Sequence, residues 1–313
     1  MLVHVIGNSS PTQLETPLKA KGDAPVLREK VFGLPVDRDI LFADEHNIYQ
    51  PAIEKRQRKW IVKLSFLKPF LLSGERILRI TPARSPVRWH EQLVTGGLFI
   101  GLESAFLVFT TFRILHIPTG SNLAYRQCIA QVRYRDIRSI RLGWQGLVMD
   151  YKNGRRECFG GIPRREKKKI RQLLPALPLV KQALQPVGRR HLCPRCTAVL
   201  SERTMRCRRC ALPFKSRKIA ALMAVLFPGG GYVYLRLIFP AIVLGLLEVL
   251  VLAAFVATEA HVVPVEANRF LILAGLGLIW VAIKTAGWLH AGHFIKQYIP
   301  RKVRLGHWSP SGS

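Results

Sequence analysis

Four cysteines offer the clearest chemistry in the chain. Cys193 and Cys196 form one closely spaced pair, and Cys207 and Cys210 form a second pair further along. Each pair makes a turn that directs two sulfur atoms at one position, so the four thiolates supply tetrahedral coordination that suits Zn²⁺. A redox dithiol is the alternative, but it would need only one pair. Because four protein ligands leave no position for an activated water, we expect a structural zinc site and not a catalytic one.

Two ionisable residues and two histidines lie in or near long apolar runs that follow the cysteines. Glu248 and Lys284 each fall inside such a run, and charges within a membrane are candidates for function. Antiparallel neighbouring helices would let them form an ion pair. His290 and His293 could serve a metal or haem, or could be ordinary interfacial histidines. No Ser/His/Asp pattern, paired carboxylates or phosphate loop is present in the sequence, which therefore does not indicate an enzyme.

The basic charge of the chain lies mainly before these apolar runs. The 313 residues carry a formal net charge of +29, and most of the Lys and Arg precede residue 218. Such a surface favours partners that bear phosphate, either nucleic acid or an anionic lipid leaflet. Composition alone does not choose between them.

The chain before the cysteines divides into four segments. Residues 1–54 lack periodicity and are expected to form a flexible tail. Residues 55–72 predict a basic amphipathic helix, which either lies on a membrane surface or packs against the next domain. Residues 73–176 alternate short β-type runs with turn residues, as a mainly-β domain does. Residues 177–190 are rich in proline and form a linker to the cysteine segment, 191–214.

Several details support the β-rich assignment of 73–176. Asn153-Gly154 between two alternating runs is a strong hairpin signal. Pro163 suits the first position of a helix that closes the domain. Cys128 and Cys158 fall in strand-like runs and are expected to be buried, unpaired thiols.

This region resembles the pleckstrin-homology-like and GRAM-like domains of bacteria, in the stretches LLSGERILRI, FLVFTTFRILHI, RYRDIRSIRL and YKNGRRECFGGIPRREKKKIRQLL. The resemblance implies a barrel capped by a C-terminal helix, and an adaptor that binds lipid headgroups or peptides. A headgroup in such domains often sits after the first strand, where this chain has Arg84 and Arg88. The closing helix supplies further candidates for an anionic surface: Arg164, Arg165, Lys167, Lys168, Lys169 and Arg171.

The apolar half predicts a helical hairpin. Residues 238–257 and 270–290 are each about as long as the roughly 20 residues that a bilayer core requires. Basic residues flank the pair on both outer sides, so both termini are expected in the cytosol. Residues 218–236 contain Pro228 and three glycines and predict a short interfacial or re-entrant segment. Residues 291–313 are expected to form a basic cytosolic tail.

Two further resemblances concern this half. The cysteine segment is similar to the minimal zinc ribbons of bacterial membrane proteins. The Gly-rich turn before Tyr232 resembles a small membrane domain with two transmembrane segments, although Arg236 stands where that family has a glycine. The expected fold class is thus multidomain: a mainly-β pleckstrin-homology-like barrel, a zinc ribbon and an α-helical transmembrane hairpin.

Three classes of function are compatible with this organisation. The first is a non-enzymatic inner-membrane adaptor that presents the basic domain and the ribbon to the cytosol, with an anionic lipid leaflet and a protein partner or homo-oligomer as partners. The second is a membrane-tethered protein that binds nucleic acid. The third is a small subunit of a membrane transport assembly. It would have to be a subunit, because two spans cannot enclose a pathway without oligomerising.

Overall fold

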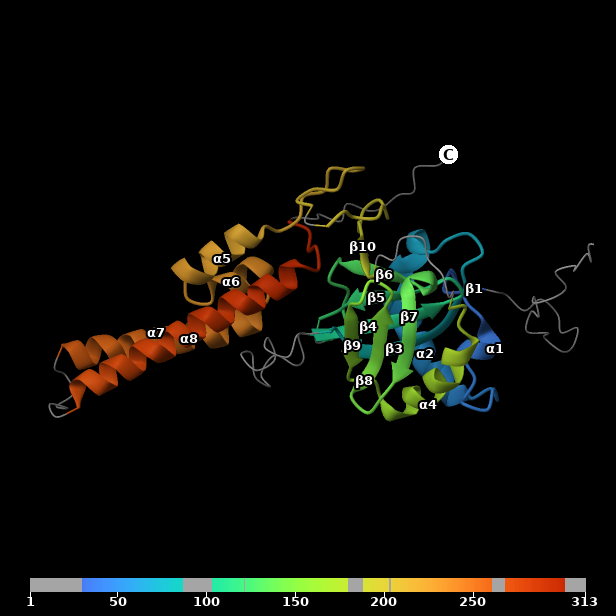
Figure 1. Ribbon diagram of the computed structural model, residues 1–313, viewed down its shortest axis with the longest axis horizontal. Coiled ribbons are helices and arrows are strands. Elements are labelled where there is room, and N and C mark those ends of the chain that lie inside the picture. The colour runs from blue at the N-terminus through green and yellow to red at the C-terminus, as the bar shows by residue number, and fades with distance from the viewer. Residues whose placement is uncertain are drawn as a thin grey trace, which may run out of the picture.

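The computed structural model describes residues 30–86, 103–120, 122–179, 188–202, 204–260 and 268–301. These residues form a β-rich part and a helical part that projects away from it (Figure 1). The elements of the β-rich part are β1 (Lys30–Val31), β2 (Leu34–Pro35), α1 (Arg38–Leu41), α2 (Pro51–Lys63), the 3₁₀ helix η1 (Ser65–Phe70), β3 (Ile77–Arg84), β4 (Ser104–Thr110), β5 (Arg113–Pro118), β6 (Ile129–Arg133), η3 (Tyr134–Asp136), β7 (Ile137–Leu142), β8 (Gly146–Tyr151), β9 (Arg156–Gly160), α4 (Arg164–Leu173), η4 (Leu174–Ala176) and β10 (Arg190–Leu192).

Besides the two-stranded β1–β2 sheet, two larger antiparallel sheets form the β-rich part. One has the order β10-β6-β5-β4-β3, and the other has the order β7-β8-β9. Seven strands followed by one helix agree with the predicted element order. The expected closed barrel is wrong, because no hydrogen-bonded pairing joins the two sheets among the described residues. The sheets instead share an apolar core in which Phe109, Met149, Phe159 and Ile170 are buried.

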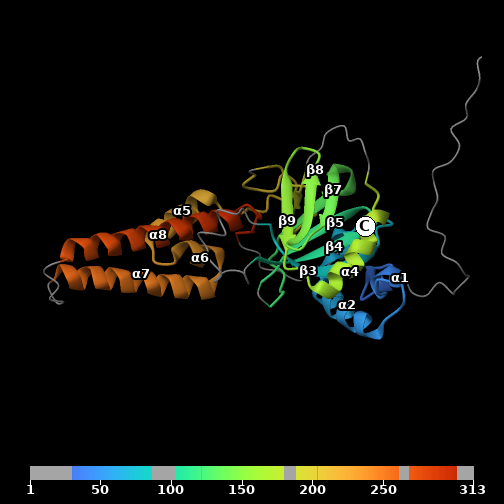
Figure 2. The same cartoon turned by 60° about the horizontal axis from the view of Figure 1, so that its bottom comes forward.

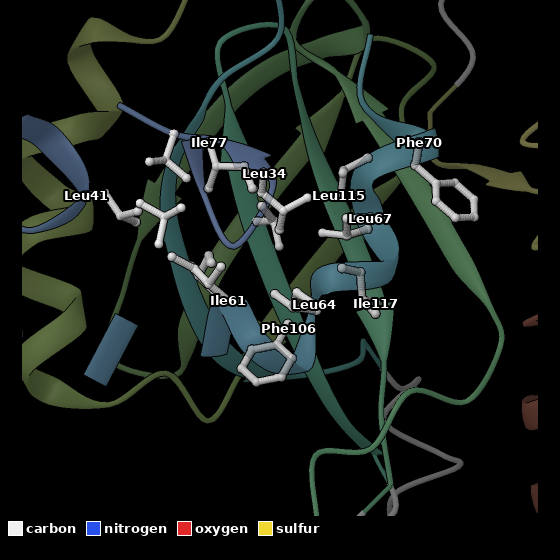
Figure 3. Packing of buried hydrophobic residues seen from close by; sticks show 14 of the residues in the cluster. Leu34, Leu41, Ile61, Leu64, Leu67, Phe70, Ile77, Phe106, Leu115 and Ile117 are labelled. Carbon is white, nitrogen blue, oxygen red and sulfur yellow. The ribbon is translucent and has the colours of Figure 1, made fainter. Parts of the chain in front are cut away.

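The larger sheet is covered on both faces, which explains its continuous apolar runs. Every residue of β5 is buried, and so is all of β4 after Ser104. One face meets the smaller sheet and α4. A second core on the other face gathers residues from the β1–β2 hairpin, α1, α2 and η1, including Leu34, Leu41, Ile61 and Leu67 (Figure 3). Strands buried on both faces lose the alternation that marks a half-exposed strand.

The N-terminal segment corrects the expected tail. Residues 30–54 belong to the fold, and Leu34 and Leu41 are fully buried in the core. Phe32 and Gly33 both have positive φ and make the two-residue turn between β1 and β2, which is the backbone that a tight hairpin needs. Val36 then bridges to Ile77 at the start of β3. Residues 1–29 lie outside the described residues.

The predicted basic helix of 55–72 is packed and does not lie free. α2 begins at Pro51, and its Ile61 is fully buried in the core. Gln57 is also fully buried and donates a hydrogen bond from Nε2 to the Ile80 carbonyl on β3. The chain continues through η1 into the same core. This arrangement favours the packed-helix alternative of the sequence analysis.

Buried arginine–glutamate pairs join distant elements of the β-rich part. Arg79 on β3 and Glu166 on α4 are buried, with Arg79 Nη2 2.8 Å from Glu166 Oε2, and Arg56 on α2 reaches the other carboxylate oxygen at 2.7 Å. Arg79 also donates to the Leu41 carbonyl. A second pair, Arg113 and Glu75, is bidentate, with Nε–Oε1 and Nη2–Oε2 distances of 2.9 and 2.8 Å.

The helical part consists of α5 (Arg217–Leu226), α6 (Gly230–Leu235), α7 (Ile238–Glu259) and α8 (Arg269–Ile295). α7 and α8 lie side by side (Figures 1 and 2). Both are long and apolar enough to cross a membrane, and they extend the predicted spans 238–257 and 270–290 by a few residues. Large apolar side chains face outward, among them Phe239 and Phe270, which are 74% and 82% exposed.

The expected linker and C-terminal tail both need correction at the junction of the two parts. Arg190, the last residue of the predicted linker 177–190, already pairs with Gln131 in the larger sheet. The predicted tail 291–313 begins inside α8, which runs to Ile295. Beyond it, the Lys215 amide donates to the Ile299 carbonyl, and the Arg301 amide donates to the Pro213 carbonyl. The chain beyond α8 is therefore paired with the end of the cysteine segment and with Lys215, which follows it.

The Arg79–Glu166–Arg56 network predicts the cost of removing one charge. Glu166→Gln keeps the shape of the side chain but leaves the buried Arg79 without a counter-charge, so we expect the free energy of unfolding to fall by about 3–5 kcal/mol. Urea unfolding of the full-length protein in detergent, followed by near-UV circular dichroism, measures the change. The matched control is Glu202→Gln, since that side chain is 80% exposed and 3.7 Å from Arg155. Equal midpoints for the two variants would contradict the prediction.

Candidate metal centre and its surroundings

The four cysteines lie on two turns of the same construction. The Cys193 amide donates to the Ala198 carbonyl, and the Cys207 amide donates to the Leu212 carbonyl. Thr197 and Ala211, each directly after the second cysteine of its pair, both have left-handed backbone with φ near 60°. An antiparallel bridge joins the residues on either side of each turn, Leu192 to Val199 and Arg206 to Pro213. The two short loops therefore present their sulfur atoms in equivalent ways.

The sulfur atoms meet at a spacing that fits one metal ion. Cys193 and Cys210 have Sγ atoms 3.5 Å apart, as do Cys196 and Cys207, and all four lie within 4.8 Å of one another. Zn–S bonds of about 2.3 Å in a tetrahedron place sulfur atoms about 3.8 Å apart. Cys193 and Cys207 are buried, while Cys196 and Cys210 are partly exposed. The four cysteines could thus hold a metal ion with all four positions filled by protein.

Local hydrogen bonds lower the pKa of one cysteine of this cluster, Cys207. Burial raises the pKa of Cys207, but amide donors from Cys210 and Arg209 and the thiols of Cys196 and Cys193 outweigh burial and lower it to about 7. Burial raises the pKa of Cys193. Metal ligation needs the thiolate form and releases the remaining protons. The surroundings of Cys207 therefore favour its thiolate, whereas burial opposes the thiolate of Cys193.

The cysteine segment is held between the two parts of the molecule. At its start, β10 pairs with β6. At its end, Phe214 bridges to Pro300 beyond α8, and the Tyr298 ring packs against Phe214 at 5.6 Å and His191 at 4.9 Å. Its own buried core has few members: Cys193, Leu200, Cys207, Leu212 and Phe214. Two of these are cysteines of the candidate metal centre, so the local order of the segment depends on the cysteines.

The predicted cationic residues have different surroundings. Arg84, at the end of β3, and the α4 residues Arg164, Arg165 and Arg171 are exposed. Lys169 corrects the prediction, because it is buried and donates to Asn47 Oδ1 at 2.8 Å. Lys168 is exposed but lies 3.2 Å from Glu45. Arg88 lies outside the described residues.

The structure brings Arg84 and α4 to one end of the smaller sheet. A Cβ on Gly161, just before α4, would lie 2.8 Å from Arg84 Cγ, so the arginine covers this glycine. Lys167 on α4 donates to the Trp144 carbonyl at the tip of the β7–β8 hairpin. Trp144 itself is 86% exposed and was missed by the sequence analysis. The sequence feature that could have identified it is a large apolar residue in the turn GWQG, where polar residues are usual.

Glu248 and Lys284, the predicted pair, lie with Lys284 Nζ 2.7 Å from Glu248 Oε2. Both also contact the turn between α5 and α6. Lys284 donates to the carbonyls of Ala224 and Phe227 at 3.1 and 3.3 Å, and the Gly229 amide approaches Glu248 Oε1 at 3.5 Å. The pair thus provides hydrogen-bond partners for backbone carbonyl and amide groups at the end of α5 and in the turn that follows it.

The glycines of this turn are required by close packing. A Cβ on Gly230 would lie 2.1 Å from the Met223 carbonyl oxygen, and one on Gly229, at φ +63°, would lie 2.3 Å from that of Ala241. Arg236, which stands at the glycine position of the family that this turn resembles, ends α6 with φ 62°. That backbone is the one that favours glycine at a helix end.

The remaining candidates have structural partners. His290 is buried, and its Nδ1 lies 2.9 Å from the Tyr232 hydroxyl; the side chain of His293 is outside the described residues. Cys128 is buried as expected, whereas Cys158 is only partly buried.

A buried Ser85–His116 contact is oriented against nucleophilic catalysis. Ser85 Oγ lies 3.0 Å from His116 Nε2, and Arg189 Nη1 lies 3.0 Å from His116 Nδ1. A guanidinium can only donate, so Nδ1 accepts and Nε2 carries the proton of the neutral ring. His116 then donates to Ser85 and cannot act as its base.

Comparisons with known protein families, with curated proteins and with solved structures find no match to this chain.

The metal centre predicts a specific loss of metal. Cys207→Ser removes one ligand and the thiol of lowest pKa among the shifted ligand cysteines, so we expect the metal content of purified full-length protein to fall from about one ion per chain to well below that. Elemental analysis of the protein after gel filtration measures it. Cys158→Ser is the matched control and should keep its metal. Retention of the ion in the Cys207 variant would contradict the assignment.

The contacts of Lys284 predict that exchanging the two charged residues of the ion pair does not restore stability. Lys284→Met leaves Glu248 and two carbonyls without their donor, and we expect a loss of stability on the order of 3–5 kcal/mol. The exchanged variant Glu248→Lys with Lys284→Glu restores opposite charges, but a carboxylate cannot donate to the Ala224 and Phe227 carbonyls. We therefore expect no rescue in thermal unfolding of the full-length protein in detergent. Full rescue would show that charge attraction alone matters.

Proposed function

We propose that this protein is a non-enzymatic inner-membrane adaptor that holds a basic, pleckstrin-homology-like domain and a zinc ribbon at the cytosolic face of the bilayer. The observation that carries the proposal is the backbone pairing of the cysteine segment with both β6 and the chain beyond α8. Two long apolar helices are thereby joined to a cytosolic surface through a defined joint. A tether of this kind suits recruitment and scaffolding.

The dimensions of α7 and α8 support a membrane-spanning pair. Their 22 and 27 residues give lengths of about 33 and 40 Å, enough to cross a hydrocarbon core of about 30 Å. Exposed cations gather at the end nearest the ribbon: Arg217, Lys218, Arg236, Lys296 and Arg301. Since basic flanks remain inside, this end and both termini lie in the cytosol.

The segment α5–α6 then enters the bilayer from the inner side and returns. α5 has 10 residues and is about 15 Å long, roughly half of the hydrocarbon core. Leu222, Val225 and Leu226 are exposed on it and would face acyl chains. Irregular backbone at such depth is tolerated only where protein satisfies it. Lys284 and Glu248 supply those contacts, which gives the intramembrane pair a structural role.

The ligands and partners follow from the chemistry of the two cytosolic elements. Four thiolates in a closed set suit Zn²⁺ in a structural role. Seven strands in two antiparallel sheets with one closing helix support the pleckstrin-homology-like assignment. The exposed cations Arg84, Arg164, Arg165 and Arg171 suit an anionic leaflet. A protein partner or a second copy of the chain would occupy the remaining surface.

The topology predicts the outcome of reporter fusions. Green fluorescent protein at the C-terminus should fluoresce, because it folds in the cytosol. Alkaline phosphatase at the same point should stay inactive, because it needs the outer side of the membrane. Alkaline phosphatase fused after Glu259 should be active. The chain should also remain in the membrane pellet after alkaline carbonate extraction. Release by carbonate, or an active phosphatase at the C-terminus, would contradict the proposal.

A further inference from the structure

The tip of the β7–β8 hairpin presents a tryptophan on a fixed backbone. Trp144 is 86% exposed. The Gly143 amide donates to the Gly146 carbonyl at 2.9 Å, and Lys167 Nζ donates to the Trp144 carbonyl at 2.7 Å. Gly146 has φ +155°, and a Cβ there would lie 2.1 Å from the Phe159 carbonyl oxygen, so the turn requires glycine. A large apolar ring is therefore held outward by a well-supported turn.

Exposed cations lie beside this tip. Gly146 pairs with Gly160 in the sheet, and the next residue, Gly161, is covered by the Arg84 side chain. Arg164 and Lys167 are one turn apart on α4 and share a face. Among the described residues, neither Arg84 nor Arg164 has a carboxylate oxygen within 4.0 Å. We call Arg84, Trp144, Arg164 and Lys167 the Trp144 edge.

The strands that border the Trp144 edge lie near the helical part, whereas α4, which carries Arg164 and Lys167, lies farther from it (Figures 1 and 2). In both views β9, the partner of β8, is the strand of the smaller sheet nearest to α5–α8, and the end of β3 points toward the helical part (Figures 1 and 2). β3 ends at Arg84. A bilayer around α7 and α8 would therefore lie on the side of β9 and the end of β3, where the Arg84 side of this edge is.

We propose that Trp144 inserts into the headgroup layer of the anionic membrane that holds α7 and α8, with Arg84 and Arg164 facing lipid phosphates. The inference rests on the proposed membrane function and names the surface that meets the lipid. Tryptophan prefers the membrane–water interface, because its ring is apolar and its N–H is polar. An apolar anchor flanked by cations is the composition of surfaces that lie on anionic lipid. Lys167 serves by fixing the tip.

The test uses full-length protein labelled with 5-fluorotryptophan, in nanodiscs of phosphatidylcholine and phosphatidylglycerol in equal parts. A lipid that carries a nitroxide on its headgroup broadens the ¹⁹F resonances of nearby rings, and ascorbate reverses the effect. Trp144→Phe identifies the Trp144 resonance. We expect that resonance to broaden severalfold, while Trp60, which packs on Phe106 inside the β-rich part, stays sharp. Trp288 on α8 should broaden and reports on the membrane placement itself.

Two further samples test the charge contribution. The double variant Arg84→Gln with Arg164→Gln, and nanodiscs of phosphatidylcholine alone, should each reduce the broadening of Trp144 and leave that of Trp288 unchanged. A sharp Trp144 beside a broadened Trp288 would overturn this inference while the membrane hairpin stands, and would leave the edge to a protein or nucleic-acid partner. A sharp Trp288 would overturn the membrane placement as well.

Discussion

Four cysteine sulfur atoms lie within 4.8 Å of one another, a spacing at which ionised thiolates repel strongly unless a metal ion lies between them. The cysteine segment has a core of five buried residues, two of them ligands, which is too little apolar burial to order a chain segment by itself. A bound metal ion would supply the missing free energy. The backbone pairings of this segment with β6 and with the chain beyond α8 depend on that order. With a metal ion bound, the connection between the β-rich part and the helical part would depend on one coordination shell.

Buried charges fix the positions of elements elsewhere in the molecule. Arg79–Glu166 joins β3 to α4, Arg113–Glu75 joins β5 to the segment after η1, and Lys284–Glu248 joins α8 and α7 to the α5–α6 turn. Such pairs add little net stability compared with apolar residues, but they are costly to break. Each one also satisfies a backbone carbonyl, of Leu41, Phe70 or Ala224. Their effect is to permit one arrangement of elements and to penalise others that leave these groups without partners.

Features with a local signal could be predicted from the sequence, and features made by distant contacts could not. Closely spaced cysteine pairs and long apolar runs are complete within a short window, as is the Asn153-Gly154 turn. By contrast, Glu166 and Lys169 stand in a run of charges that suggests a solvated helix face. Glu166 is buried because it pairs with Arg79, and that partner is 87 residues away in the sequence, so no local pattern indicates the pair. Residues 30–54 suggest a tail for the same reason, since Leu34 and Leu41 become core residues only against the sheet.

In the proposed membrane arrangement, the connection through the cysteine segment also determines how strongly the β-rich part must bind lipid. Because the cysteine segment is paired with β6 and with the chain beyond α8, the β-rich part would not reorient freely, and the fold would set the face that it turns to the proposed bilayer. Tethering turns lipid contact into an intramolecular event with a high effective concentration. A weak attraction of a few exposed arginines and one tryptophan is then sufficient to keep that face on the membrane, and a deep headgroup pocket is unnecessary. The rest of the basic surface stays available to a partner from the cytosol.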